Sequence, residues 1–138
     1  MSSVIAENAI TTALAGQFPD VRLVVALAER VDNEQLPPLW QAVTFISQGD
    51  SARSIGSPAC RRELGIARVY AAARTGEGDA AAVVHADAVA QFFRNWRYAS
   101  AGTTIRIDAV IPAMRAPESD GRWLLVSTDV QFVRDYYA

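Results

Sequence analysis

Residues 47–70 constrain the fold more than any other part of the chain. This stretch begins at the end of one run of strand-forming residues and ends inside another. Between the two runs lie about a dozen residues, mostly Gly, Ser, Pro and Arg, that would bury almost nothing, and a loop of that length between strands is usually functional or disordered. The sequence therefore predicts a protruding loop between two strands, called the arm (residues 48–62) below.

The residue patterns on either side of the arm predict the helix and strands that surround it. Apolar residues at three- and four-residue spacing predict a helix over residues 4–16. Residues 21–31 are rich in Val, which favours a strand, although their Ala, Leu and Glu would also suit a helix. Residues 40–47 and 61–73 predict the strands that enter and leave the arm. In the second of these, the alternation places Ala67, Val69 and Ala71 toward a core and Arg68 and Tyr70 outward.

The second half of the chain predicts one helix and two strands. Residues 80–96 are Ala-rich and predict a helix whose buried stripe is Val84, Ala88 and Phe92, with Ala81 a turn earlier. Residues 103–111 and 122–133 alternate between apolar and polar side chains and predict an antiparallel hairpin, in which Leu124, Val126, Val130 and Phe132 face inward.

These elements predict the fold class. We expect an α+β protein: a two-layer sandwich, with a mostly antiparallel sheet packed by two helices, in the order α-β-β-β-α-β-β, and a long loop between the second and third strands. The 138 residues suffice for one core, and no composition shift marks a linker, so we expect one domain over residues 1–138. No apolar run approaches the roughly 20 residues that a membrane-spanning helix needs.

The charge pattern sets the arm apart. All 13 basic residues are Arg, which suits contacts to carboxylates and aromatic rings, although a GC-rich genome would give the same bias. The formal net charge is −2, so no overall positive field favours nucleic acid. Residues 51–75 nevertheless hold five Arg against one acid, Glu63, a local charge of +4.

The residue types that perform catalysis are scattered. Cys60 is the single cysteine and has no base near it in sequence. His85 is the single histidine, and we expect it to be a solvated or capping helix residue. Asp108 and Asp129 lie on adjacent predicted strands and could form a carboxylate pair for acid–base or metal chemistry, but two Asp on solvated strand faces are more often simply solvated. We expect no catalytic residue, no metal site and no cofactor, and thus no enzyme.

An interaction surface fits the pattern better. Arg53, Arg61 and Arg62 form the densest charged group, and they lack the aromatic neighbours of a nucleic-acid site. A docking surface for protein is the favoured interpretation, ahead of a solvated loop and a nucleic-acid-binding module. Large side chains in the outward phase of strands suggest a subunit interface or a covering helix. The residues expected at that interface are Trp40, Arg68, Tyr70, Trp123 and Leu125.

Several stretches resemble one protein family. They are the N-terminal M-S-S-V-I, then V-D-N-E-Q-L-P-P-L-W, G-S-P-A-C-R-R-E-L-G-I-A-R-V-Y, T-G-E-G-D-A-A-A-V-V-H-A-D-A-V-A and G-R-W-L-L-V-S-T-D-V-Q-F. With the order of elements, they resemble the tail terminator, or tail completion, proteins of long-tailed bacteriophages and related gene transfer particles. None of these stretches is a catalytic signature.

The resemblance implies a structural role. It implies a ring, expected to be a homohexamer, that caps the head-proximal end of the tail tube in the virion, ends tube growth and joins the tail to the neck. Its partners would be other copies of itself, the tail tube protein and a neck or head–tail connector protein, with DNA passing through the lumen without specific binding. The arm would reach the adjoining ring, with Arg53, Arg61 and Arg62 pairing with acids and Ile55 as an apolar anchor. Another connector or neck protein is the alternative.

Overall fold

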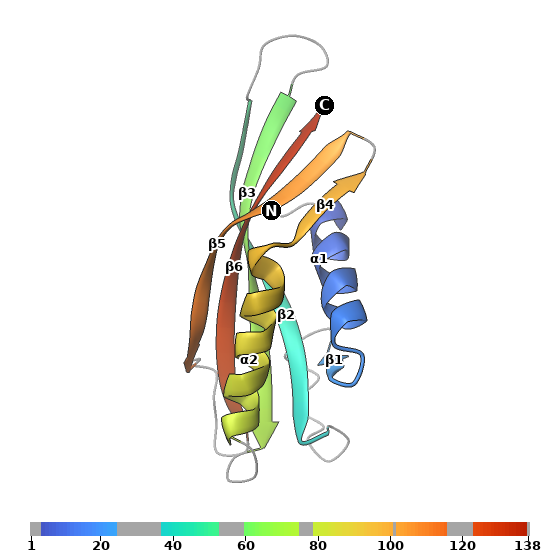
Figure 1. Ribbon diagram of the computed structural model, residues 1–138. Coiled ribbons are helices and arrows are strands. Elements are labelled where there is room, and N and C mark those ends of the chain that lie inside the picture. Colours follow the sequence, from blue (N-terminus) through green and yellow to red (C-terminus); the bar gives the residue numbers. More distant parts are fainter. Residues whose placement is uncertain are drawn as a thin grey trace.

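A computed structural model describes residues 4–24, 37–52, 60–74, 79–100, 102–115 and 123–137. In these residues the chain forms two helices and a six-stranded sheet, which confirms the α+β class (Figure 1). The predicted order lacked one strand, β4. In chain order the elements are α1 (Val4–Gln17), β1 (Arg22–Val24), β2 (Leu39–Ala52), β3 (Cys60–Arg74), α2 (Asp79–Arg94), β4 (Arg97–Ser100), β5 (Thr103–Arg115) and β6 (Trp123–Tyr137).

The sheet is mixed and has the strand order β1-β2-β3-β6-β5-β4. β1 pairs parallel with β2, and the other four pairings are antiparallel. β4 is only four residues long and follows α2 after two residues, so it shows too little alternation to be predicted. Of residues 21–31, the structure describes 21–24, and β1 confirms a strand there; the rest of that prediction lies outside the described residues.

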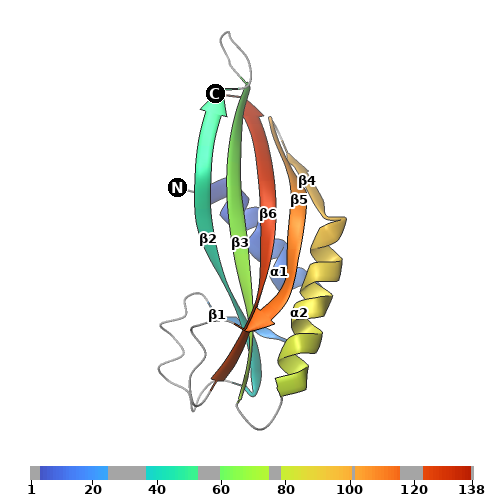
Figure 2. The same cartoon turned by 90° about the vertical axis from the view of Figure 1, so that its left-hand side faces the viewer.

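The two described ends of the predicted arm are strand. β2 and β3 stay paired from Leu39↔Ala73 to Ala52↔Arg61, so residues 48–52 and 60–62 belong to a long β-hairpin, and residues 53–59 lie outside the described part. The register shifts once, between Ser47 and Gly49, and Gly49 has a positive φ of 129°, which a glycine accepts without strain. The far end of this hairpin extends well past both helices (Figure 2). These strand ends could not be recognised in the sequence because their side chains are polar. Their partners lie on other strands, far away in the sequence.

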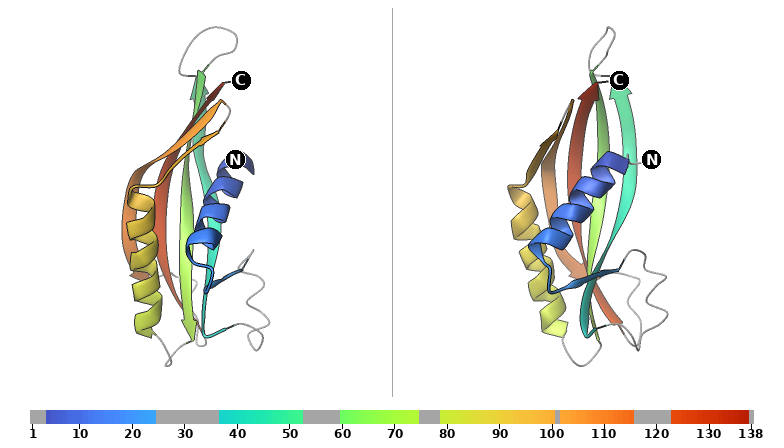
Figure 3. Two further views of the ribbon diagram at one scale, coloured as in Figure 1. Left: turned by 45° about the vertical axis from the view of Figure 1, so that its right-hand side comes forward. Right: turned by 90° about the vertical axis from the view of Figure 1, so that its right-hand side faces the viewer.

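Both helices lie on the same face of the sheet, here called the helix face (Figure 3). α1 buries Ala6, Ile10 and Leu14, at the predicted four-residue spacing, while Val4 and Ile5 are exposed. These side chains join one core cluster with residues from α2 and three strands. The other buried members of this cluster are Ala67, Val69, Val89, Phe93, Ile105, Val130 and Phe132. The predicted inward phases of β3 and β6 are therefore confirmed.

The predicted stripe of α2 is wrong for Val84 and Ala81, whereas Phe92 packs partly buried against the core. Val84 is 68% exposed and Ala81 is exposed, whereas Ala82, Ala86, Val89 and Phe93 are buried against the sheet. The helix is rich in Ala and Val almost all round, so the three- and four-residue spacing fits more than one face, and the packing partner selects the face. Neither described helix is long and apolar enough to cross a membrane.

The opposite face, here called the outer face, has its own buried cluster. Its members are Val24, Trp40, Ala42, Tyr70, Ala72, Trp123 and Leu125. The rings of Trp40 and Trp123 meet edge to face with centroids 5.5 Å apart, a geometry that adds about 0.5–1.5 kcal/mol beyond area burial. Trp40, Tyr70, Trp123 and Leu125 are thus at most 3% exposed within one chain, so these large outward side chains are covered within the chain itself.

Candidate docking surface at the end of the β2–β3 hairpin

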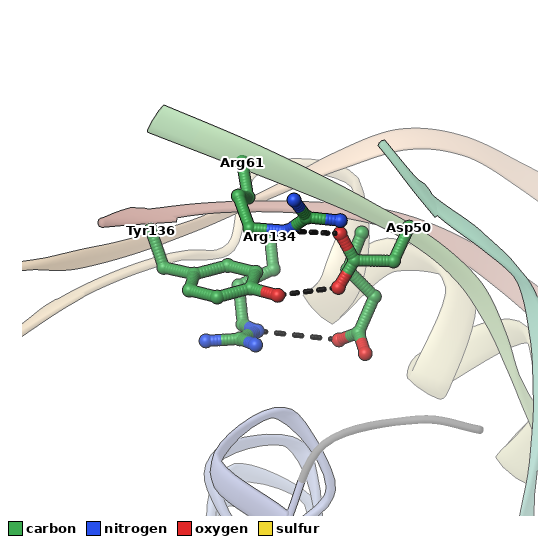
Figure 4. Close-up of polar contacts among 5 residues, drawn as sticks. Asp50, Arg61, Arg134 and Tyr136 are labelled. Atoms are coloured by element: carbon green, nitrogen blue, oxygen red, sulfur yellow. Dashed lines mark hydrogen bonds and ion pairs between the residues drawn. The ribbon is translucent and has the colours of Figure 1, made fainter. Parts of the chain in front are cut away.

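Five polar side chains gather on the helix face where the hairpin projects past the helices (Figure 4). Strand alternation brings them together, because the register pairs Asp50 with Glu63, Glu63 with Arg134, and Arg61 with Tyr136. We call Asp50, Arg61, Glu63, Arg134 and Tyr136 the hairpin cluster. Its two acids balance its two arginines, so the cluster carries little net charge.

The inner half of the hairpin cluster is buried. Arg134 Nε donates to Glu63 Oε1 at 3.2 Å, and these two side chains are only 6% and 4% exposed. The guanidinium of Arg134 also lies 3.8 Å above the ring of Tyr136, in cation–π contact. Removing one partner of such a pair leaves a buried charge uncompensated, so the pair ties β3 to β6.

The outer half of the cluster is partly exposed. Asp50 accepts from the Tyr136 hydroxyl, and Arg61 Nε donates to Asp50 Oδ1 at 3.0 Å. The hydrogen bond from Tyr136, then the one from Arg61, hold the pKa of Asp50 below its usual range despite the opposing effect of burial. The same carboxylate raises the pKa of Tyr136, because the phenol proton is in the Asp50 hydrogen bond. These contacts link β2, β3 and β6 at the end of the hairpin.

The outer face carries two bidentate ion pairs between β3 and β6. Arg62 donates to both oxygens of Asp135 at 2.8 and 2.9 Å, and Arg68 donates to both oxygens of Asp129 at 2.7 and 3.0 Å. Forked pairs of this kind fix orientation as well as adding energy. Between them, Leu64 is 41% exposed, and Ile46, which is 40% exposed, pairs on β2 with Ile66, two residues along β3 from Leu64. The projecting hairpin therefore presents apolar side chains framed by charge pairs.

The structure gives the predicted arm residues a different role. Arg61 and Arg62 pair within the chain, with Asp50 and Asp135, and remain partly exposed, so a partner can reach their remaining N–H groups. Arg53 and Ile55 lie outside the described residues. Arg68, expected at a subunit interface, is paired with Asp129. Sequence reasoning missed the acids because they come from other strands, and only the strand register reveals the pairing.

The residues considered for catalysis are dispersed. Asp129 pairs with Arg68, whereas Asp108 sits at a register shift in β5 and lies 3.6 Å from Arg106, so the two carboxylates do not face each other. Cys60 is the first residue of β3 at the hairpin end, and His85 lies in α2 against β2. Among the described residues, no group of three or more His, Cys, Asp and Glu could hold a metal ion.

His85 corrects another prediction. Rather than being solvated, it is buried, and its Nε2 lies 2.7 Å from Oε1 of Gln41, which is itself fully buried. Gln41 Nε2 donates to the carbonyl of Val21, and Phe18 meets the His85 ring edge to face. Burial lowers the pKa of His85, so a neutral ring donates to Gln41. This chain of contacts joins α2, β2 and the segment after α1.

Comparison with known proteins assigns the chain to a family. The model of the family described as "Phage tail terminator protein" matches residues 7–132 of the 138. This match begins inside α1, ends inside β6 and covers all the elements between them. A search of curated protein sequences gives no match. The chain therefore belongs to the phage tail terminator protein family and has a structural role in a phage tail.

Proposed function

We propose that this protein forms a homo-oligomeric ring that caps the head-proximal end of the tail tube, ends tube growth and joins the tail to the neck. The match to the terminator family over residues 7–132 carries this proposal. The role requires a rigid subunit and a surface that reaches the next ring, and it requires no chemistry. In this proposal the protein is not an enzyme, its partners are its own copies, the tube protein and a neck protein, and DNA passes through the lumen without specific binding.

The projecting hairpin is the surface that we assign to docking on the adjoining ring. It extends beyond the helices, and side-chain contacts cross-link it at its far end. Because these contacts fix the hairpin within the monomer, docking would cost little conformational entropy. Leu64 and Ile46 supply exposed apolar area, and the arginine–aspartate pairs on either side supply polar contacts.

A pair of substitutions tests the docking surface. Leu64→Glu places a charge among the exposed apolar residues of the hairpin, and Val84→Glu places the same charge on the exposed face of α2 as a matched control. Both variants should fold and assemble as the natural protein does, as measured by thermal unfolding and native mass spectrometry. Only Leu64→Glu should lose co-sedimentation with assembled tail tubes. Equal binding of both variants to tubes would remove the hairpin from the docking surface.

Immunogold electron microscopy tests where this protein lies in the phage particle. Immunogold labelling of purified particles should put this protein at the junction between tube and neck. Label along the tube or at the distal end would contradict the proposal, and label on the neck alone, with tubes of normal length in its absence, would favour a connector protein.

A further inference from the structure

The two edge strands of the sheet are short, so within the described residues most of the edge of each neighbouring strand has no strand partner. β1 pairs only with residues 40–42 of β2, so among the described residues no strand pairs with the outer edge of residues 43–52. On the other side, β4 pairs only with residues 103–106 of β5, which leaves the outer edge of residues 107–115 without a described strand partner. Each edge of the sheet is therefore stepped: β1 or β4 is the outermost strand over a short part of the edge, and β2 or β5 is outermost over the rest (Figure 2). We call each of these two offsets a step.

The strand register shows that the two steps are complementary. Following the pairs across the sheet, Ala99 lies level with Thr104, Asp135, Arg62 and finally Ser51. β4 thus projects on one side at the level where β2 is open on the other. In the same way, Leu23 of β1 lies level with Gln41, Ala71, Val126 and finally Arg115. β1 thus projects at the level where β5 is open.

The open side of β2 also has space beside it. A groove of about 480 Å³ lies between α1 and residues 43–45 of β2, next to the end of β1 and nearer to β1 than the level of Ser51. Its lining residues are Glu7, Asn8, Thr11, Leu23, Val24, Val43, Thr44 and Phe45. Unpaired strand edges of this length are templates for pairing with another chain, and native proteins cover them.

We propose that copies of this chain join head to tail through these steps, with β4 of one subunit beside β2 of the next and β1 of the next beside β5 of the first. The proposal rests on the ring of the proposed function and identifies its subunit contact. Counting along the sheet, β2 and β4 run in the same direction and β1 and β5 run in opposite directions, so both new pairings are allowed. A contact between two different edges is heterologous and closes into a ring when its rotation permits.

An isologous contact fits the shape less well. Two β2 edges brought together by a two-fold axis would leave both β4 strands and both β5 edges uncovered. The head-to-tail contact covers both steps at once, because each projecting strand is one strand spacing wide, about 4.8 Å. We therefore assign β4 of a second copy to the edge of β2 around Ser51.

Disulfide cross-linking tests the contact. In a Cys60→Ser background, Ser51→Cys and Ala99→Cys place two thiols at the same level, both at exposed positions in the outer-face phase. Neighbouring strands bring Cα atoms within the roughly 4.4–6.8 Å that a disulfide spans. Mild oxidation of the assembled protein should give a ladder of covalent oligomers up to the full ring on non-reducing gels. Ser51→Cys with Asp87→Cys, a thiol at an exposed position on α2, is the matched control and should give no ladder.

Each result decides the proposal. A ring by native mass spectrometry without a ladder would overturn the β4–β2 contact and leave the ring intact. Covalent dimers from the single Ser51→Cys variant would show two β2 edges together and overturn the head-to-tail contact. A monomer at every concentration would overturn both the contact and the ring.

Discussion

At the scale of single residues, Gly65 shows how tightly the helix face is packed. A Cβ added to Gly65 would lie 2.5 Å from Cζ of Phe132, directly opposite on β6. The Phe132 ring is 1% exposed and belongs to the main core cluster, so it has little room to move. The ring of Phe132 can therefore pack against β3 only because Gly65 has no side chain.

Gly65→Ala should lower the free energy of unfolding by about 1–3 kcal/mol, the usual cost of overpacking a core. Gly16→Ala is the control, because nothing lies within 4 Å of its added Cβ and alanine favours the helix. Urea unfolding of both variants measures the difference. Equal stability of Gly65→Ala and the natural protein would mean that Phe132 has space that the structure does not show.

His85 makes stability depend on pH. Burial lowers its pKa in the folded chain, whereas the unfolded chain has the ordinary value near 6.5, so below that pH the unfolded state binds a proton that the folded state does not. The free energy of unfolding should therefore fall as the pH drops from 7.5 to 5.5. His85→Gln should show a smaller fall over the same range. If both proteins lose the same stability, His85 is not the group that titrates.

At the scale of elements, ion pairs stabilise the projecting strands where apolar contacts are few. Glu63→Ala should cost about 3–5 kcal/mol, because it leaves Arg134 buried without its carboxylate. Glu63→Leu with Arg134→Leu should cost less than Glu63→Ala alone, because neither charge remains. Thermal unfolding of the three proteins tests this order. A double variant less stable than Glu63→Ala would mean that the remaining contacts of Arg134, including Tyr136, dominate.

The elements also show how far the sequence predicts this fold. Alternation predicted the inward phases of β3 and β6, and spacing placed α1, because one face of each meets the core. Residues 48–52 at the end of β2 were predicted as a loop, since Asp50 finds its partners Arg61 and Tyr136 only through the sheet register. The outward phase was likewise taken as exposed, although Trp40 and Trp123 are buried together there. Pairing across strands is information that a single sequence does not display.

At the scale of the whole molecule, the described parts combine features that suit a ring subunit. Both helices cover one face, the hairpin projects beyond them, and the two sheet edges are stepped at complementary levels. The helix-face core and the outer-face cluster are both buried within one chain, so their apolar side chains do not need a second subunit to bury them. The proposed contacts therefore use strand edges and the hairpin end rather than the apolar cores.

The central claim is that this protein ends tail-tube growth, and tail length in particles made without it tests that claim most directly. Electron microscopy of lysates in which the gene is deleted should show tubes longer than normal and not joined to heads. Supplying the natural protein in trans should restore the normal length and the joining. Tails of normal length attached to heads in the complete absence of the protein would contradict the account.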